Sequence, residues 1–137
     1  MSQLKRLREM HRLANSIRRT YNRLRHTTDQ IHAGTDLSAP KRTLMLDIDW
    51  AGPQTVPMLA ESRYVSRQII QSQVNELIIA GYFELRTNPR HKRSRLVTLT
   101  GEGEAMVRQM IKDENAFLET LDWIPEGRLF QVPHRNV

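Results

Sequence analysis

The stretch VSRQIIQSQVNELIIAG, residues 65–81, decides how the rest of this chain is interpreted. Its apolar side chains collect on one side of a helical wheel, which predicts an amphipathic helix whose buried side carries Ile69, Ile70, Val74, Leu77 and Ile78. The opposite side displays uncharged hydrogen-bonding groups, namely Gln68, Gln71, Ser72 and Asn75, with Arg67 at its edge. Carboxamides and hydroxyls both donate and accept hydrogen bonds, as do the base edges in a DNA major groove. The pattern predicts a helix that reads DNA.

A second, shorter helix is predicted immediately upstream. Thr55 is a suitable N-cap for a helix from Val56 to about Ser62, and Ser66 is a suitable N-cap for the next one. The residues between them, 63–65, would form a tight turn, and two short helices joined in this way form a helix-turn-helix. Such turns often contain glycine, whereas here Arg63 or Tyr64 occupies that place.

A basic hairpin is predicted immediately downstream. Residues 82–86 and 95–100 alternate in the manner of strands, and the polar loop between them contains the turn signal Asn88-Pro89. The segment from Arg86 to Arg95, both included, contains five Lys or Arg residues. A hairpin in this position is the wing of a winged helix, and its basic tip would lie against phosphates or in a minor groove. The alternative is an unrelated exposed hairpin whose charges serve solubility.

The flanking segments are predicted to be helices that form a dimer. Residues 2–33 carry apolar side chains at steps of three and four, and so long an amphipathic helix cannot be buried against so small a core. Such helices usually pack against a partner copy. A second helix is expected to begin near Asp36 or Ser38 and to end at about Ile48, followed by a loop over residues 50–53, and a last helix is expected from Gly101 to about Asp122. The predicted dimer contacts are Leu4, Leu7, Leu13, Ile17, Tyr21, Phe117 and Leu121.

The charge distribution supports a polyanionic partner. The 137 residues carry a net charge of +6, with eight Lys or Arg against two acids in residues 1–33 and seven against two in residues 63–95. Two basic blocks separated by acidic ones suggest local anion-binding surfaces, of which nucleic acid is the commonest large partner. We therefore expect a mainly α protein with a dimerisation helix in residues 1–36, a winged helix-turn-helix in residues 37–100 and a further dimerisation helix with a short tail in residues 101–137.

Other function classes find little support in the sequence. The absence of cysteine excludes disulfides and thiolate metal sites and favours a reducing compartment, and no apolar run approaches the ~18 residues of a membrane span, so we expect a cytoplasmic protein. A metal held across a dimer by His11 with Glu9, or by His26 with Asp29, is less common than isolated surface histidines. No nucleophile–base pattern and no glycine-rich phosphate loop is present, so neither catalysis nor a cofactor is predicted.

The order of these motifs resembles that of the MarR family of transcriptional regulators over roughly residues 7–122. The resemblance rests on Thr55-Val56-Pro57-Met58-Leu59-Ala60, on Val65-Ser66-Arg67-Gln68 followed by Val74, Leu77 and Gly81-Tyr82-Phe83-Glu84, and on Asn88-Pro89 followed by Lys92-Arg93, Val97-Thr98-Leu99-Thr100 and Gly103. It implies a homodimer that binds a pseudo-palindromic DNA site, with recognition helices in successive major grooves and wings in the flanking minor grooves.

The resemblance also implies regulation. Such regulators are commonly repressors released by a small aromatic or anionic ligand bound between the two subdomains, and by analogy the ligand-binding candidates here are His11, Asn15, Arg18 and Trp50. We therefore predict a dimeric, sequence-specific regulator. The alternatives are a winged helix used for protein–protein interaction, a phage or plasmid control protein without small-molecule sensing, and a small ligand- or metal-binding enzyme.

Three features of the sequence depart from the family pattern. The wing usually has an aspartate just before its two basic residues, and here that position is His91, which could make wing geometry or DNA affinity depend on pH. Ser72 stands where many members have a basic residue, which shifts base reading towards Gln68 and Gln71. The last long helix of the family is nearly missing, so the first helix and residues 101–122 would have to carry the dimer.

Each predicted DNA contact has a distinct role. Gln68 and Gln71 are predicted to contact bases, because a glutamine carboxamide pairs bidentately with adenine, and Ser72 and Asn75 share their helix face. Ser66 and Arg67 at the helix start suit a phosphate, as do Arg63 and Tyr64 in the turn. In the wing, the residue expected to enter the minor groove is Arg93, and the positioning charges are Arg90, Lys92 and Arg95.

Overall fold

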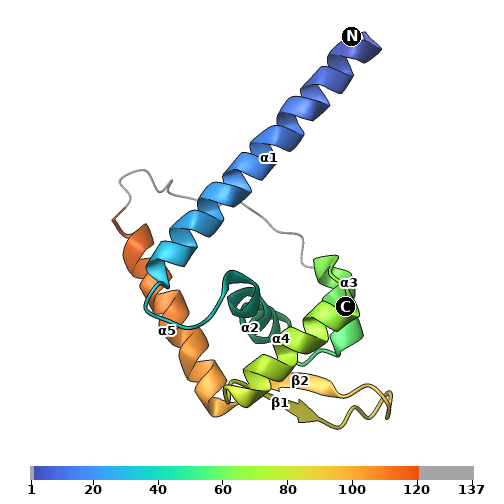
Figure 1. Cartoon of the computed structure of the whole chain (residues 1–137), viewed down its shortest axis with the longest axis vertical. Helices are drawn as coiled ribbons and strands as arrows, with labels where there is room; N and C mark the ends of the chain where they lie inside the picture. The colour runs from blue at the N-terminus through green and yellow to red at the C-terminus, as the bar shows by residue number, and fades with distance from the viewer. Residues whose placement is uncertain (1, 121–137) are drawn as a thin grey trace.

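The computed structural model describes residues 2–120 and contains a helix-turn-helix followed by a β-hairpin (Figure 1). The predicted fold class, mainly α with a small hairpin, is confirmed. The elements in chain order are α1 (Gln3–Ile31), α2 (Ala39–Ala51), α3 (Val56–Arg63), α4 (Arg67–Ile79), β1 (Phe83–Arg86), β2 (Leu96–Leu99) and α5 (Gly101–Leu118).

Helix α1 is the predicted long helix, and most of it projects away from the rest of the molecule (Figure 1). Its N-cap is Ser2, whose side chain accepts a hydrogen bond from the Lys5 amide at 3.3 Å. The helix buries none of its own residues, and its apolar stripe lies in solvent, with Leu4 61% exposed and Ile17 60% exposed. A stripe of this length without a partner is consistent with the expectation that α1 packs against another chain.

The hydrophobic core lies where α2, α3, α4, α5 and the hairpin meet. Each element contributes buried apolar side chains, and Leu37, just before α2, adds one more. The buried core residues are Leu37, Leu44, Met45, Ile48, Leu59, Ala60, Ile70, Val74, Leu77, Phe83, Val97, Val107 and Met110. Three of the five apolar residues assigned to the buried side of α4 belong to this core, and Ile78 packs against it from the edge. Ile69 does not, because it is 50% exposed at the border of the buried face.

Helix α2 is longer than the sequence predicted. Trp50 and Ala51 were expected in a loop, but both belong to α2, and the helix ends only at Gly52. The Gly52 amide donates to the Ile48 carbonyl at 2.9 Å, and φ of +81° at Gly52 turns the chain out of the helix. The positive φ of Gly52 therefore ends the helix after Ala51, and the last helical turn before the glycine stays intact.

The two helices of the helix-turn-helix begin at the two predicted N-cap residues. The Thr55 hydroxyl accepts from the Met58 amide at the start of α3, and the Ser66 hydroxyl accepts from the Ile69 amide at the start of α4, both at 3.2 Å. Tyr64 between the helices adopts the left-handed conformation with φ 54° and ψ 39°. Tyr64 thus occupies the place that glycine often takes in such turns, while Arg63 is the last residue of α3.

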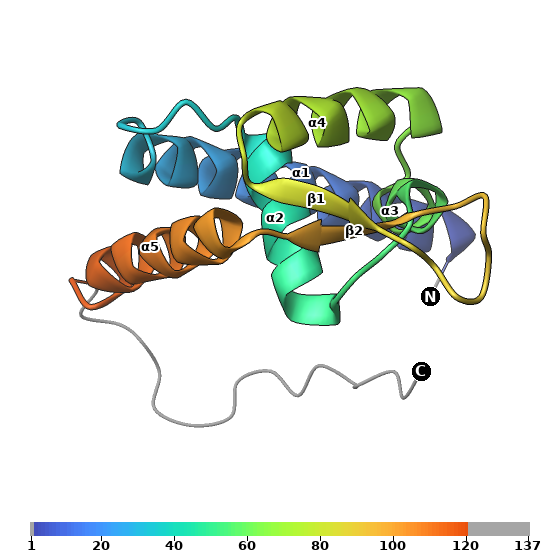
Figure 2. The same cartoon turned by 90° about the horizontal axis from the view of Figure 1, so that it is seen from below.

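The hairpin is held against the helix-turn-helix by an additional bridge. Strands β1 and β2 pair antiparallel, with Phe83 opposite Leu99, and Gln54 just before α3 forms an isolated bridge with Val97. The two bridging hydrogen bonds join Val97 N to Gln54 O at 2.7 Å and Gln54 N to Val97 O at 3.3 Å. Figure 2 shows the loop between the strands extending beyond the helices next to α3.

Helix α5 begins at a close contact with the chain that follows α4. The Thr100 hydroxyl caps it by accepting from the Gly103 amide at 3.0 Å, and the Thr100 amide donates to the Tyr82 carbonyl at 3.0 Å. A Cβ on Gly103 would lie 2.2 Å from the same carbonyl oxygen, which explains the glycine. The predicted end of this helix near Asp122, and the predicted dimer residue Leu121, lie outside the described residues.

Candidate nucleic-acid interface

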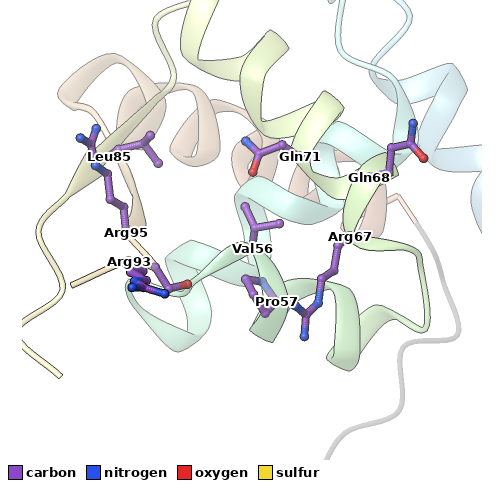
Figure 3. Close-up of a pocket in the computed structure, with 9 residues that line it drawn as sticks. Val56, Pro57, Arg67, Gln68, Gln71, Leu85, Arg93 and Arg95 are labelled. Carbon is purple, nitrogen blue, oxygen red and sulfur yellow. The ribbon is translucent and has the colours of Figure 1, made fainter. Parts of the chain in front are cut away.

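A groove separates the start of α4 from the hairpin. It has a volume of about 530 Å³ and is lined by Val56, Pro57, Arg67, Gln68, Gln71, Leu85, Arg93, Ser94 and Arg95. In Figure 3 the hairpin side chains stand on one side and those of α4 on the other, with Val56 and Pro57 between them. The structure therefore brings together five of the predicted DNA-binding residues from two separate elements.

The groove is strongly positive. Its lining contains three arginines and no acidic residue. Within residues 2–120, none of Arg67, Arg93 and Arg95 belongs to an ion pair. Three guanidinium groups without a carboxylate partner attract anions, and guanidinium matches the geometry of phosphate oxygens.

The outward face of α4 carries the remaining predicted recognition residues. Ser72 and Asn75 are exposed on this face and lie outside the groove lining, whereas Gln68 belongs to both surfaces. Gln71 Nε2 donates to Asn75 Oδ1 at 2.8 Å, so one carboxamide holds the other in place. Ile79 continues the same face with 87% exposure. The result is a row of hydrogen-bonding groups beside a basic groove.

Arg63 at the end of α3 and Tyr64 in the turn after it have different surroundings. Tyr64 is 98% exposed. The Arg63 guanidinium pairs with the Asp47 carboxylate, and its Nη2 donates to the Thr43 carbonyl at 3.2 Å. Both partners belong to α2, so Arg63 connects the turn to that helix. Its role as a DNA contact stays a prediction, beside a structural role that the sequence did not indicate.

The loop of the hairpin is shaped by Asn88. Its side chain is largely buried, Oδ1 accepts from the Arg90 amide at 3.1 Å, and its carbonyl accepts from the His91 amide at 3.2 Å. These bonds present Arg90, His91 and Lys92 to solvent at the hairpin tip. The proposed pH effect of His91 stays a prediction.

Four lining residues of the groove were not predicted from the sequence. Val56 and Pro57 were seen only as the start of a helix, Leu85 only as a strand residue and Ser94 only as part of the polar loop. Leu85 shares the strand face of buried Phe83 but lies past the core, where it is 39% exposed and forms part of the groove wall. Strand alternation could have placed Leu85 inward, but the bridge of Gln54 to Val97, which places α3 beside the hairpin, left no signal in the sequence.

A polar junction joins α1, α2 and α5. Buried Arg42 donates to Asp29 Oδ1 at 2.6 Å and to the Leu37 carbonyl at 2.7 Å. The ring of His32, which is also buried, lies with Nε2 2.8 Å from Glu114 Oε1, and its Nδ1 has no hydrogen-bond partner within the described residues. These contacts connect the end of α1 to α2 and to α5.

A cavity of about 270 Å³ borders this junction. Its lining, from three helices, comprises Tyr21, Leu24, Arg25, Thr28, Ala39, Arg42, Thr43, Leu46 and Glu114. The ligand candidates predicted by analogy are not among them: His11, Asn15 and Arg18 are exposed on α1, and Trp50 is 84% exposed at the end of α2. Within residues 2–120, no three His, Asp or Glu side chains lie close enough to hold a metal ion, and no helix is long and apolar enough to cross a membrane.

Several solved structures share this fold. A MarR family transcription regulator is 30% identical, with a TM-score of 0.66 over 82% of this chain and 77% of that one. A mutant MarR from E. coli in complex with operator DNA is 22% identical, with a TM-score of 0.67 over 87% of this chain and 83% of that one. BpsR of Bordetella bronchiseptica, whose DNA binding is regulated by 6-hydroxynicotinic acid, is 19% identical, with a TM-score of 0.66 over 82% and 81%.

The matches to curated sequences cover less of the chain than the matches to solved structures do. Uncharacterized proteins of Mycobacterium tuberculosis and Mycobacterium bovis are 36% identical over 72 residues, which is 50% of this chain and 50% of each of theirs. The match thus spans about half the length of these relatives. No family model matches the chain.

Proposed function

The chain belongs to the MarR family of transcription regulators, and from this premise we propose that it is a homodimer that binds double-stranded DNA at a pseudo-palindromic operator. We further propose that it acts as a repressor that a small ligand releases from DNA. Residues 37–100 would form the DNA-binding unit, and α1 and α5 the dimer interface.

The observation that carries the proposal is the basic groove between α4 and the hairpin. Arg67, Arg93 and Arg95 line it from both sides, and the hydrogen-bonding face of α4 begins at its edge with Gln68 and Gln71. In duplex DNA, one phosphate backbone separates the major groove from each neighbouring minor groove. A groove of this charge, placed between a polar helix and a basic hairpin tip, suits that backbone.

We infer the roles of the two flanks of the groove from this placement. With a phosphate backbone in the groove, α4 lies in the major groove, where Gln68 and Gln71 meet base edges, and the hairpin reaches the minor groove with Arg93. Ser66, Tyr64 and the backbone amides at the start of α4 then face phosphates. Arg90 and Lys92 extend the positive charge at the hairpin tip.

The dimer rests on apolar surfaces that no described residue covers. The exposed stripe of α1 runs from Leu4 to Leu24, and α5 adds Ile111, Phe117 and Leu118 at 38–46% exposure. Covering such a stripe by a second copy removes several hundred Å² of apolar surface from water, at roughly 25 cal/mol per Å². Two recognition helices would then face the same side of the DNA.

The cavity beside the α1–α2–α5 junction supports ligand control. Its lining combines the aromatic ring of Tyr21, apolar Leu24 and Leu46, and the two cations Arg25 and Arg42 against one carboxylate, that of Glu114, which contacts His32. These groups suit a small aromatic anion. Occupation of the cavity would change how α1 sits on α2, and thereby the separation of the two DNA-binding units in the dimer.

The test is selection of DNA fragments from a random pool with the purified chain. We expect recovery of an inverted repeat with half-sites about one helical turn apart, ~34–36 Å. The matched control replaces Arg67, Arg93 and Arg95 together by glutamine, with folding checked by circular dichroism, and is expected to enrich nothing. If the unmodified chain enriches no sequence, it is not a sequence-specific regulator.

Ligand release has its own measurement. Benzoate added to the chain on its selected operator is expected to raise Kd, and Arg25→Gln is expected to reduce that effect while operator binding without benzoate stays unchanged. If benzoate raises Kd equally for both proteins, it does not release the chain from DNA by binding in this cavity.

A further inference from the structure

We propose that the face of α1 opposite its apolar stripe is a second nucleic-acid-binding surface, which holds the phosphate backbone of a DNA segment other than the one in the groove. The surface, called here the basic stripe, consists of Lys5, Arg8, Arg12, Arg19 and Arg23. The proposal goes beyond operator binding and does not depend on it.

The basic stripe follows from the helical positions of these residues. At 3.6 residues per turn, the five side chains fall within an arc of about 60°, roughly opposite the apolar residues Ile17 and Tyr21. All five are exposed. From Lys5 to Arg23 the stripe spans about 27 Å at 1.5 Å per residue. It is therefore a continuous surface.

The charges of the basic stripe are not neutralised within the described part of the chain. The acids of α1 are Glu9 and Asp29, and both lie outside the arc. Glu9 forms no ion pair with Lys5 or Arg12 in residues 2–120, and Asp29 pairs instead with Arg25 and Arg42. A solvated helix usually interleaves opposite charges, because like charges three or four residues apart destabilise it. A stripe of one sign indicates an anionic partner.

Duplex DNA is the partner that fits best. It carries one negative charge per ~1.7 Å of axis, so a length of duplex of about 27 Å carries on the order of 16 phosphate charges, more than the basic stripe can neutralise. A lipid surface fits less well, because a helix that lies on a membrane inserts its apolar face, and in the proposed dimer the apolar stripe of α1 is covered by a second copy. The same arrangement leaves the basic stripe free when the apolar stripe is covered by a second copy.

The basic stripe and the groove serve different DNA segments. Figure 1 shows the N-terminus of α1 and the hairpin at opposite ends of the molecule. The residues of α1 that border the cavity with α2 and α5 begin only at Tyr21, so most of the basic stripe lies on the projecting part of the helix. Such a protein could hold its operator and a second duplex at the same time.

The test uses the full chain saturated with a short unlabelled operator duplex and titrated with a labelled 30-base-pair duplex of random sequence. We expect the saturated protein to bind the second duplex with a strong salt dependence. The variant R8Q/R12Q/R19Q should lose about tenfold or more in affinity for that duplex, and the slope of log K against log salt should fall by about 3. Operator affinity should stay within about twofold, because the groove is unchanged.

The control variant R18Q/R108Q/K112Q removes the same charge from exposed residues outside the basic stripe and is expected to bind the second duplex like the unmodified chain. Equal losses of affinity in both variants would show that binding of the second duplex depends only on net charge, and would overturn the proposal. So would failure of the saturated chain to bind a second duplex, preferential binding to anionic vesicles, or dissociation of R8Q/R12Q/R19Q into monomers, which would assign the stripe to ion pairs between subunits.

Failure of operator selection would be a separate result. In that case the unmodified chain and both variants are titrated directly with the random duplex, in the background of R67Q/R93Q/R95Q. A loss confined to the stripe variant supports the basic stripe, and equal affinities contradict it.

Discussion

The guanidinium of Arg63, at the end of α3, pairs with the carboxylate of Asp47 on α2. The contact connects the turn of the helix-turn-helix to the helix behind it, and the Thr43 carbonyl accepts a further hydrogen bond from the same guanidinium. The orientation of α4 relative to the core thus depends partly on a residue that the sequence suggested only as a phosphate contact.

Asp47→Asn and Arg63→Gln are expected to have the same effect. Each should lower the free energy of unfolding by about 0.5–1 kcal/mol, because the pair is partly exposed. Each should also weaken operator binding, since both release the turn. Urea unfolding and operator titration of the two variants check this. A larger loss of affinity for Arg63→Gln would show that its guanidinium also contacts phosphate.

Gln71→Ala is expected to change sequence preference. Loss of a bidentate pair with adenine should cost about 1–3 kcal/mol on the operator and little on scrambled DNA. The control is Gln109→Ala on α5, since Gln109 donates to Asp113 at 2.8 Å just as Gln71 donates to Asn75. Equal losses on operator and scrambled duplexes would contradict base reading by Gln71.

Arg93→Ala is expected to weaken binding to operator and scrambled duplexes alike. Because Arg93 has no ion-pair partner in residues 2–120, its charge is available to the DNA backbone, and its loss should reduce the salt slope by about 1. Titrations at four salt concentrations measure the slope. An unchanged slope would place Arg93 away from the DNA.

Gly103→Ala is expected to destabilise the fold by about 1–3 kcal/mol, because the added methyl would lie 2.2 Å from the Tyr82 carbonyl oxygen. Gly101→Ala, two residues earlier in α5, has nothing within 4 Å of the new methyl and should be neutral or slightly stabilising. Urea unfolding at one fixed protein concentration compares the two. Similar stability in both would show that the start of α5 can shift away from Tyr82.

Glu114→Ala is expected to lower the free energy of unfolding by about 1–3 kcal/mol, because it leaves the buried His32 ring without its only hydrogen-bond partner in residues 2–120. Glu114→Gln keeps an acceptor at the same place and should retain most of the stability. The comparison uses unfolding at pH 7. If the two variants unfold alike, the hydrogen bond to His32 contributes little.

Ile17→Glu is expected to convert the proposed dimer to monomers, since it places a carboxylate in the middle of the apolar stripe of α1. Asn22→Glu adds the same charge to an exposed position away from that stripe and should leave the dimer intact. Sedimentation velocity at micromolar concentration distinguishes them. A dimeric Ile17→Glu variant would place the interface on another surface.

Local sequence signals predicted most of the elements, because each signal acts over a few residues. Thr55 and Ser66 each cap the helix that their position indicated, and the alternation of residues 82–86 and 95–100 gave the hairpin. The predicted end of α2 at about Ile48 was three residues too early, because the helix continues through Ala51 to the glycine whose φ ends it.

The sequence by itself determined the order of the elements, the polar face of α4 and the two faces of α1, since helical and strand periodicity depend only on neighbouring residues. Only the tertiary structure decided that Arg67 and Arg95 line one groove, and that Arg63 is held by Asp47. Those relationships depend on the bridge between Gln54 and Val97 and on the packing of α2 behind the turn. Contacts between residues far apart in the chain leave no periodic pattern in either segment.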